Sequence, residues 1–259
     1  MKTSQFQGTA ILAVGPAGIL PTDKCAKATG KMPIFPTARL AVPRRLARFS
    51  TKLKSFYSIN SMQRLLIATH NADKTCEIQE ILGPEFHVQD LSAYPAIPET
   101  TESGRTFEEN AILKAVAASR QYPGLVIADD SGLEVDALGG APGIFSARYT
   151  GAGTNDQQNV SKLLSELARI GRRPEDRGAR FRCVIALARD GKLLDTFEGL
   201  VEGEIAELPR GNEGFGYDPI FVPNGFSETF AQLSANTKNR ISHRAKALAK
   251  LKQYLQTNS

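Results

Sequence analysis

The feature that most constrains the fold of this chain is the octet Leu-Val-Ile-Ala-Asp-Asp-Ser-Gly at residues 125–132. A short apolar run followed by turn residues is typical of a buried β-strand. We expect this strand to end at the two carboxylates, at the edge of a core where α/β proteins bind ligands. Asp129 and Asp130 cannot both be buried and ionised without a cation or donors nearby, and Mg²⁺ would satisfy them. The alternative is a strand followed by an ordinary Asp-Ser-Gly turn.

The composition is that of a globular protein, with 41% hydrophobic and 23% charged residues in a chain of 259. No apolar run approaches the roughly 18 residues of a membrane span, so we expect no membrane partner. The three cysteines are far apart and form no CxxC pair, which argues against a zinc site. So few cysteines fit a reducing compartment, and we expect a cytoplasmic location.

The net charge of +5 is unevenly distributed along the chain. Residues 1–61 contain ten Lys or Arg and one acidic residue, so this segment carries +9 and the remainder −4. The basic character therefore gives no argument for a nucleic-acid surface on residues 62–259, and we expect no nucleic-acid polymer as a partner.

Residues 1–61 also differ from the remainder in pattern, because Gly and Pro are scattered among basic residues without sustained periodicity. Three interpretations compete. In the first, an upstream start codon was chosen and Met62 is the natural start. In the second, the segment is an organelle transit peptide. In the third, it is a disordered basic arm. In each case we expect a basic, disordered N-terminal extension followed by one functional domain, residues 62–259.

Strand and helix signals alternate from Met62 onward. Strands are expected at 65–69, 125–128, 180–188, 193–205 and 220–222, with a hairpin turn at Asp190-Gly191. Helices are expected after the potential caps Asn71, Thr106 and Asn155, and over 241–256. This order predicts an α/β fold with a mixed sheet, in one domain or two lobes.

The turn at 69–74, Thr-His-Asn-Ala-Asp-Lys, joins the first strand to the first helix. A helix N-terminus offers free backbone N–H groups and a partial positive charge, which attract phosphate, and Lys74 adds a cation. Many caps of this type bind nothing, and the chain contains no GxxxxGK[ST] motif.

Two groups near the second helix are also candidates. Glu102 lies in an irregular loop before Gly104, where it could complement Asp130 as a metal ligand. Asn110 and Lys114 are four residues apart and share a helix face, which either meets something polar or is solvated.

The C-terminal part of the chain contains two further candidate segments. Gly-Phe-Gly-Tyr-Asp-Pro at 214–219 could place Phe215 against a purine, or it could form a tight turn with core aromatics. Lys238, His243 and Arg244 could present hydrogen-bond donors to phosphate or a base carbonyl. The alternative for these three is a basic, solvated helix start.

Five blocks in this order closely resemble the inosine/xanthosine triphosphate pyrophosphatase family. They are residues 69–74, 102–115, 128–149, 215–221 and 242–244, within a match that covers about residues 62–255. His70 departs from the family, which often has Gly at this position, and residues 1–61 have no counterpart in the family core.

The resemblance implies a two-lobed α/β fold with the site in the cleft between the lobes, usually as a homodimer. It implies Mg²⁺-dependent hydrolysis of a nucleoside triphosphate (ITP, dITP or XTP) to the monophosphate and pyrophosphate. Asp130 resembles the general base and a metal ligand, and Glu102 resembles the second carboxylate at the metal. The substrate-binding positions that it implies, together with the two lysines expected to hold the triphosphate, are Thr69, His70, Asn71, Ala72, Asp73, Lys74, Lys114, Ser131, Phe215, Gly216, Tyr217, Asp218, Lys238, His243 and Arg244.

Hydrogen-bond polarity supports this substrate class. Hypoxanthine and xanthine carry a 6-oxo acceptor where adenine carries a 6-amino donor, so donors from His243 or Arg244 would favour the former. A non-catalytic nucleotide-sensing module that uses the same cleft is the alternative function. The paired carboxylates favour the enzyme, because a pure binder gains little from carboxylates that face phosphates.

Overall fold

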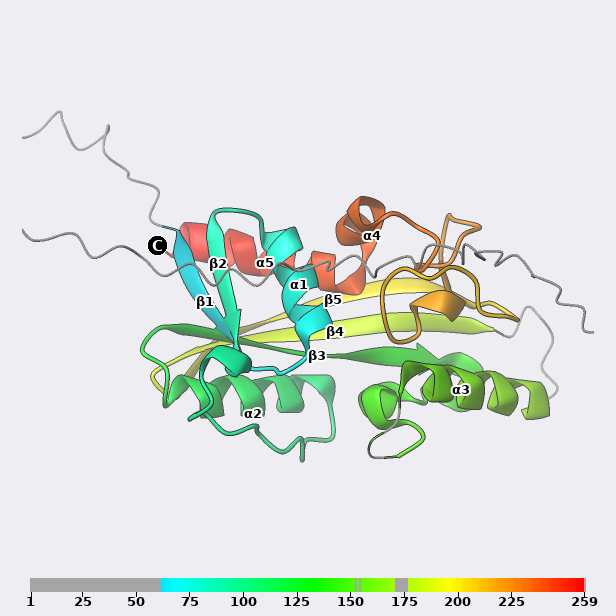
Figure 1. Cartoon of the computed structure of the whole chain (residues 1–259), viewed down its shortest axis with the longest axis horizontal. Helices are drawn as coiled ribbons and strands as arrows, with labels where there is room; N and C mark the ends of the chain where they lie inside the picture. Colours follow the sequence, from blue (N-terminus) through cyan, green and yellow to red (C-terminus); the bar gives the residue numbers. More distant parts are fainter. Residues whose placement is uncertain (1–61, 152, 154, 171–176, 259) are drawn as a thin grey trace, which may run out of the picture. The chain divides into compact units, whose positions relative to one another are not determined.

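The protein is described by a computed structural model that covers residues 62–258, except 152, 154 and 171–176. The expected N-terminal extension, residues 1–61, lies outside the described residues. The described part is built on one mixed sheet with strand order β2-β1-β3-β4-β5-β6 (Figure 1). β1 pairs in parallel with β2 and β3, and the remaining neighbours are antiparallel. The strands are β1 (Gln63–Ile67), β2 (Phe86–Asp90), β3 (Leu125–Val135), β4 (Gly178–Arg189), β5 (Lys192–Ile205) and β6 (Phe221–Pro223).

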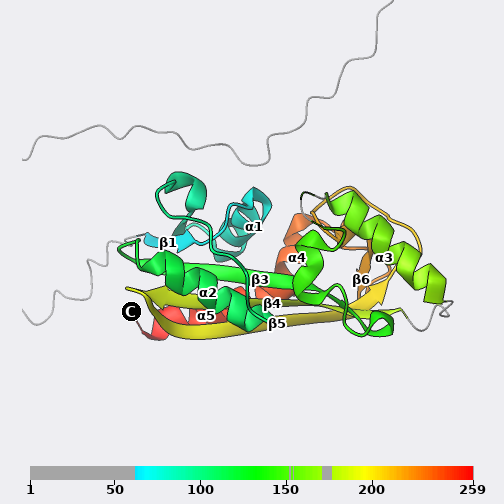
Figure 2. The same ribbon diagram turned by 90° about the horizontal axis from the view of Figure 1, so that it is seen from below.

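Helices cover both faces of this sheet, which confirms the expected α/β class. One hydrophobic cluster joins one face of β1, β3 and β4 to α1 and α5, and a second joins the opposite face to α2. Figures 1 and 2 show α3 at the far end of the sheet from β1 and β2. No helix in the described part of the chain is long and apolar enough to span a bilayer. The α-helices are α1 (Ala72–Leu82), α2 (Phe107–Ser119), α3 (Asp156–Ile170), α4 (Ala235–Ile241) and α5 (His243–Thr257).

The capping signals in the sequence position the first two helices. Asn71 Oδ1 accepts from the Lys74 backbone N at 2.9 Å and begins α1. Thr106 Oγ1 accepts from the Glu109 backbone N at 3.1 Å and begins α2. Each hydroxyl or amide oxygen satisfies a backbone donor that has no partner within its helix, which is the physical basis of the preference for these residues.

Strand β3 differs from expectation in length. It does not end at Asp129 and Asp130 but continues to Val135, paired with β4 throughout. The carboxylates therefore lie in the middle of a strand, where the helices on the two faces supply cations to them. The parallel neighbour β1 does end here, since Ile67 is its last residue and pairs with Ile127. Both carboxylates thus lie just beyond the carboxyl end of β1, the position at which α/β sheets bind ligands.

A third hydrophobic cluster occupies the far half of the sheet. It joins α3 and β6 to the ends of β3, β4 and β5. The expected hairpin is confirmed, with Asp190 in the left-handed region at φ 52°. The expected C-terminal helix over 241–256 is in fact two helices, because Ser242 ends α4 and caps α5 by accepting from the Ala245 backbone N at 3.2 Å.

Candidate functional site

The alternation of side chains along β3 separates the two adjacent aspartates. Successive residues of a strand point to opposite faces of the sheet. Asp129 faces α1 and α5, where it contacts Lys74 and Arg244. Asp130 faces α2, where it contacts Lys114. The two carboxylates therefore have different partners and can perform different tasks.

Asp129 is a buried carboxylate whose oxygens are fully occupied by donors. Lys74 Nζ lies 2.5 Å from Oδ1, and Arg244 Nε lies 3.0 Å from Oδ2. The Ser131 hydroxyl donates to Oδ1 at 2.8 Å and the Cys183 thiol to Oδ2 at 3.1 Å. Burial opposes ionisation, but the two cations outweigh it and hold the pKa of Asp129 well below its usual range. Asp129 thus joins β3 to two helices as a permanent anion.

Asp130 is only half satisfied. Its Oδ1 accepts from Lys114 Nζ at 2.9 Å, while its buried Oδ2 has no hydrogen-bond partner among the described residues. Burial raises the pKa of Asp130 even though Lys114 opposes the shift. A carboxylate with one unpartnered oxygen and a raised pKa has the properties required of a general base or of a metal ligand.

Glu102 and Asp130 both contact the same cation, which is the ammonium group of Lys114. Its Nζ donates to Glu102 Oε1 at 2.8 Å as well as to Asp130, and Arg148 holds the other Glu102 oxygen at 2.6 Å. Partial burial opposes ionisation of Glu102, but Lys114 and Arg148 lower its pKa to about 2. Two ionisable carboxylates that converge on one positive charge fit a hard divalent cation, because Mg²⁺ commonly uses one or two carboxylates with substrate phosphates. Within the described residues, no group of three or more His, Cys, Asp or Glu side chains is placed to hold a metal.

Two neighbouring cavities lie beside these groups and share wall residues, including Asn71 and Lys74. The polar cavity has a volume of about 550 Å³ and the smaller one about 110 Å³. Asp130 lines neither cavity. Its contact is with Lys114, which itself lines the polar cavity. The predicted residues in the polar cavity are Thr69, Asn71, Lys74, Glu102 and Lys114. Those in the smaller cavity are Asn71, Lys74, Ser131, Phe215, Gly216, Tyr217, Asp218, Lys238, His243 and Arg244.

The smaller cavity has an aromatic and cationic wall suited to a planar base. The ring centroid of Phe215 lies 5.0 Å from Lys238 Nζ and 5.6 Å from Arg244 Cζ. His243 stacks on Phe181 with centroids 4.7 Å apart. Burial, together with neighbouring Arg244, lowers the pKa of His243 well below its usual value, so the ring is neutral at pH 7. A neutral imidazole can donate through one nitrogen and accept through the other.

The basic cluster at the start of α5 is buried rather than solvated, which corrects the alternative of a solvated helix start. Arg244 is 1% exposed and donates to Glu77 at 2.6 Å, besides Asp129 and Ser131. Lys238 Nζ lies 2.6 Å from Asp218 Oδ2 and 3.5 Å from Glu77 Oε1. Both cations are therefore oriented by carboxylates, and Glu77 links them.

Sequence reasoning missed Glu77, although a signal for it exists. Lys74, Glu77, Ile78 and Ile81 follow the i, i+3, i+4, i+7 spacing of one helix face, and this spacing places Glu77 beside the buried Ile78 on α1. Arg148 lies in the block 128–149 that resembles the family, but the resemblance assigned it no role in the site.

Some predicted residues do not gather at the cavities. His70, Ala72 and Asp73 are exposed and line neither of them. Tyr217 is buried, and its hydroxyl donates to the Ser146 carbonyl at 2.9 Å, so its side chain serves the core even though it borders the smaller cavity.

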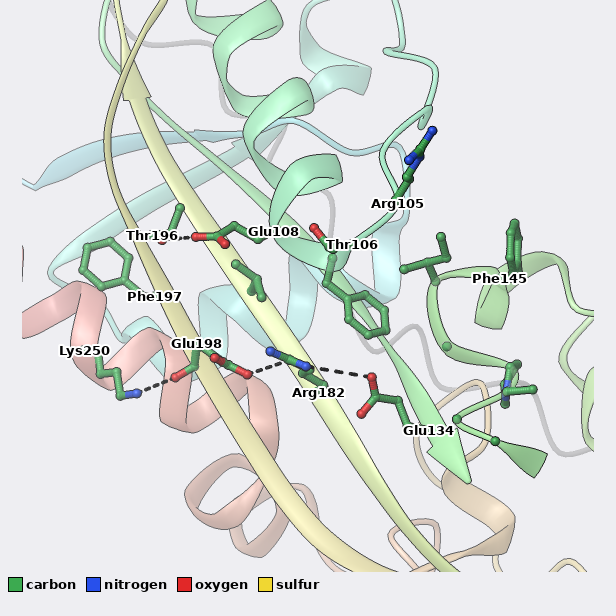
Figure 3. Close-up of a pocket in the computed structure, with 18 residues that line it drawn as sticks. Arg105, Thr106, Glu108, Glu134, Phe145, Arg182, Thr196, Phe197, Glu198 and Lys250 are labelled. Atoms are coloured by element: carbon green, nitrogen blue, oxygen red, sulfur yellow. Dashed lines mark hydrogen bonds and ion pairs between the residues drawn. The ribbon is translucent and has the colours of Figure 1, made fainter. Parts of the chain in front are cut away.

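A larger cavity of about 840 Å³ lies elsewhere, along β4 and β5 beside the start of α2 (Figure 3). Arg182 in its wall forms ion pairs across neighbouring strands, with its Nε 2.6 Å from Glu198 Oε1 and its guanidinium 4.0 Å from Glu134 Oε1. Lys250 Nζ donates to the Glu198 carbonyl at 2.6 Å. None of the predicted site residues lines it, so size alone does not identify the site.

The chain is similar to known proteins over about three quarters of its length. The chain is 50% identical over 196 residues to a protein from Bacillus subtilis named dITP/XTP pyrophosphatase, covering 75% of this chain and 98% of that protein. A protein of the same name from Geobacter sulfurreducens is 48% identical over 195 residues, covering 75% and 97%.

Solved structures of two further proteins are also similar to this chain. The Ham1 protein of Staphylococcus aureus is 43% identical with a TM-score of 0.67, and that of Coxiella burnetii is 42% identical with a TM-score of 0.68. Each match covers 76% of this chain and 100% of the other. The resemblance found in the sequence is thereby confirmed. The Ham1 family model matches residues 65–254, and the chain belongs to the Ham1 family.

Proposed function

We propose that this protein hydrolyses ITP, dITP and XTP to the nucleoside monophosphate and pyrophosphate. The observation that carries the proposal is the pair Glu102 and Asp130, held by Lys114 beside a polar cavity that adjoins an aromatic one. In this proposal the triphosphate occupies the polar cavity and the purine occupies the smaller cavity. Relatives about 50% identical and named dITP/XTP pyrophosphatase support the same substrates.

The proposed cofactor is Mg²⁺, held by Asp130 and Glu102. When bound, it would neutralise phosphate charge and lower the pKa of water at the site. Lys114 contacts both carboxylates, so it would compete with the cation for Glu102 Oε1 and Asp130 Oδ1. Once displaced, its ammonium group would contact phosphate in the cavity that it lines.

Hydrolysis in this site consists of one displacement. A water oxygen forms a bond to the α-phosphorus while the bond from that phosphorus to the bridging oxygen breaks. Asp130 takes the proton of the attacking water, and pyrophosphate departs with the electron pair of the broken bond. Lys74 and Lys114 line the polar cavity and oppose the charge that develops on the leaving group.

Base preference follows from the donors around the smaller cavity. Lys238, His243 and Arg244 carry N–H groups at its wall, which match a 6-oxo acceptor. A 6-amino group would leave a buried donor unpaired, at a cost of about 1–3 kcal/mol. The direct test is hydrolysis of ITP, dITP, XTP, ATP and GTP with Mg²⁺. Rapid hydrolysis of the first three with slow hydrolysis of ATP supports the proposal.

A nucleotide-sensing module is the alternative function, and turnover distinguishes the two. Tight ITP binding without hydrolysis in the presence of Mg²⁺ would favour the sensor. The proposal also includes a homodimer and a cytoplasmic location. Light scattering coupled to size-exclusion chromatography tests the first, with twice the chain mass expected, and cell fractionation tests the second.

A further inference from the structure

The wall of the smaller cavity includes one residue from α3 that the function described above does not use. Asp156 lines this cavity together with Phe215 and Gly216, although α3 belongs to the far end of the sheet. Its Oδ2 atom accepts a hydrogen bond from the Gly216 backbone N at 2.6 Å. This contact joins α3 to the segment 214–218, which we name the base-contacting loop because Phe215 lies within it.

Other hydrogen bonds of the base-contacting loop lie within the loop or join it to α4 and to the interior. Asp218 Oδ2 accepts from the Phe215 backbone N at 2.9 Å and from Lys238 Nζ at 2.6 Å. The Tyr217 hydroxyl donates to the Ser146 carbonyl in the interior. The Phe215–Gly216 peptide is held on both sides, because its carbonyl accepts from the Asp218 backbone N at 3.3 Å and its N–H donates to Asp156. The N–H side of this peptide therefore depends on a carboxylate from another element.

Asp156 is itself fixed in place by the start of its helix. Asn155 and Gln158 form a reciprocal capping pair, in which Asn155 Oδ1 accepts from the Gln158 backbone N at 2.9 Å and Gln158 Oε1 accepts from the Asn155 backbone N at 3.2 Å. A carboxylate in the first turn is also favoured by the helix dipole. Asp156 is thus a preorganised acceptor, and its solvent exposure means that losing it has little effect on folding.

We propose that Asp156 is a positioning residue for recognition of the base. By holding the Gly216 N–H, it fixes the Phe215 ring against the cavity before the nucleotide arrives. The free energy of binding then no longer includes the cost of ordering the base-contacting loop. This inference rests on the proposed function, because it assumes that the smaller cavity takes the base and the polar cavity takes the pyrophosphate group.

The two reaction products separate this role from a general structural one. Inosine monophosphate carries the base, whereas pyrophosphate occupies only the polar cavity. Isothermal titration calorimetry with the full chain and Mg²⁺ gives the dissociation constant of each. Asp156→Ala is expected to weaken inosine monophosphate binding about 5- to 10-fold, as for one lost hydrogen bond, and to leave pyrophosphate binding within about twofold.

Two further variants complete the test. Asp156→Asn keeps an acceptor oxygen and is expected to recover most of the lost affinity for inosine monophosphate. Gln157→Ala changes the neighbouring exposed residue, which contacts neither cavity, and is expected to bind both products like the wild type. In steady-state hydrolysis of ITP, Asp156→Ala should raise KM with little change in kcat.

Unchanged inosine monophosphate binding in Asp156→Ala would overturn the inference, as would equal weakening of both products. If Asp156→Ala fails to fold, Asp156→Ser, whose side chain is one bond too short to keep the contact with the Gly216 N–H, decides by the same comparison, with selective weakening of the nucleotide supporting the inference and equal weakening overturning it. Absence of ITP hydrolysis by the wild type would contradict the proposed function instead, and the calorimetric comparison distinguishes the two failures.

Discussion

The Nζ atom of Lys114 lies 2.9 Å from Asp130 Oδ1, and the second oxygen of that carboxylate has no hydrogen-bond partner among the described residues. The same ammonium group donates to Glu102 at 2.8 Å. Lys114 therefore balances two carboxylates at the edge of the polar cavity while leaving Asp130 with unused acceptor capacity. The contrast with Asp129, whose oxygens accept from four side chains, assigns the chemistry to one of two adjacent residues.

Asp130→Asn should abolish most turnover and spare substrate binding. The amide is isosteric but cannot take a proton from water, and loss of a general base typically reduces kcat about 10²- to 10⁴-fold. Steady-state hydrolysis of ITP measures kcat, and calorimetry measures ITP binding. Asp190→Asn, the same change in the β4–β5 turn, should behave like the wild type. Wild-type kcat in Asp130→Asn would remove this residue from the role of base.

Lys114→Met should destabilise the protein and at the same time increase its response to Mg²⁺. Removing the cation leaves the buried Asp130 carboxylate without this partner, which typically costs about 3–5 kcal/mol, while Glu102 keeps its contact with Arg148. Because Lys114 would no longer compete, added Mg²⁺ should raise the free energy of unfolding more than in the wild type. Urea unfolding with and without Mg²⁺ measures both effects. Lys192→Met, at the exposed start of β5, serves as the control. An equal Mg²⁺ response in both proteins would contradict the competition.

Arg244→Lys should lower the free energy of unfolding by about 2 kcal/mol even though it conserves the charge. The guanidinium contacts Asp129 and Glu77 at the same time, and a lysine ammonium cannot reproduce this fork. Arg240→Lys makes the same change at an exposed position of α4 and should have almost no effect. Equal denaturation midpoints for the two variants would show that the fork contributes little.

His243 should make the protein less stable as the pH falls below about 6.5. Burial lowers the pKa of this imidazole in the folded state, so between its folded pKa and about 6.5 the unfolded chain binds the proton more readily. The free energy of unfolding should therefore decrease with falling pH there, by at most about 1.4 kcal/mol per pH unit. Asp129, whose pKa is also lowered, loses its contribution only below about pH 4.

Urea unfolding between pH 8 and pH 5 tests this dependence. His243→Gln removes the titrating group and should flatten the profile over this range, whereas His87→Gln, at an exposed position, should keep the wild-type slope. A wild-type profile that is flat from pH 8 to pH 5 would contradict a buried neutral His243.

The residues that the sequence identified correctly share a local signal. Caps at Asn71 and Thr106, the turn at Asp190, and the apolar period of the strands act within a few residues, so they predict elements well. Strand β2 (Phe86–Asp90) was missed because it is short and only weakly apolar, and its pairing with β1 is a tertiary contact.

The length of β3 and the division of Asp129 from Asp130 could not follow from the apolar run alone. Both carboxylates are tolerated within the strand because α1, α2 and α5 supply Lys74, Lys114 and Arg244. Strand alternation predicts that two adjacent residues face opposite sides, but only once the strand is known to continue. Asp156 and Glu77 act through partners 60 and 167 residues away, which no local pattern reveals.

The central claim is that water attacks the α-phosphorus and pyrophosphate leaves. Hydrolysis of ITP with Mg²⁺ in water enriched in oxygen-18, followed by mass spectrometry of the products, tests it most directly. One labelled oxygen is expected in inosine monophosphate and none in pyrophosphate, with no orthophosphate released. Label in pyrophosphate, or release of orthophosphate in place of pyrophosphate, would contradict it.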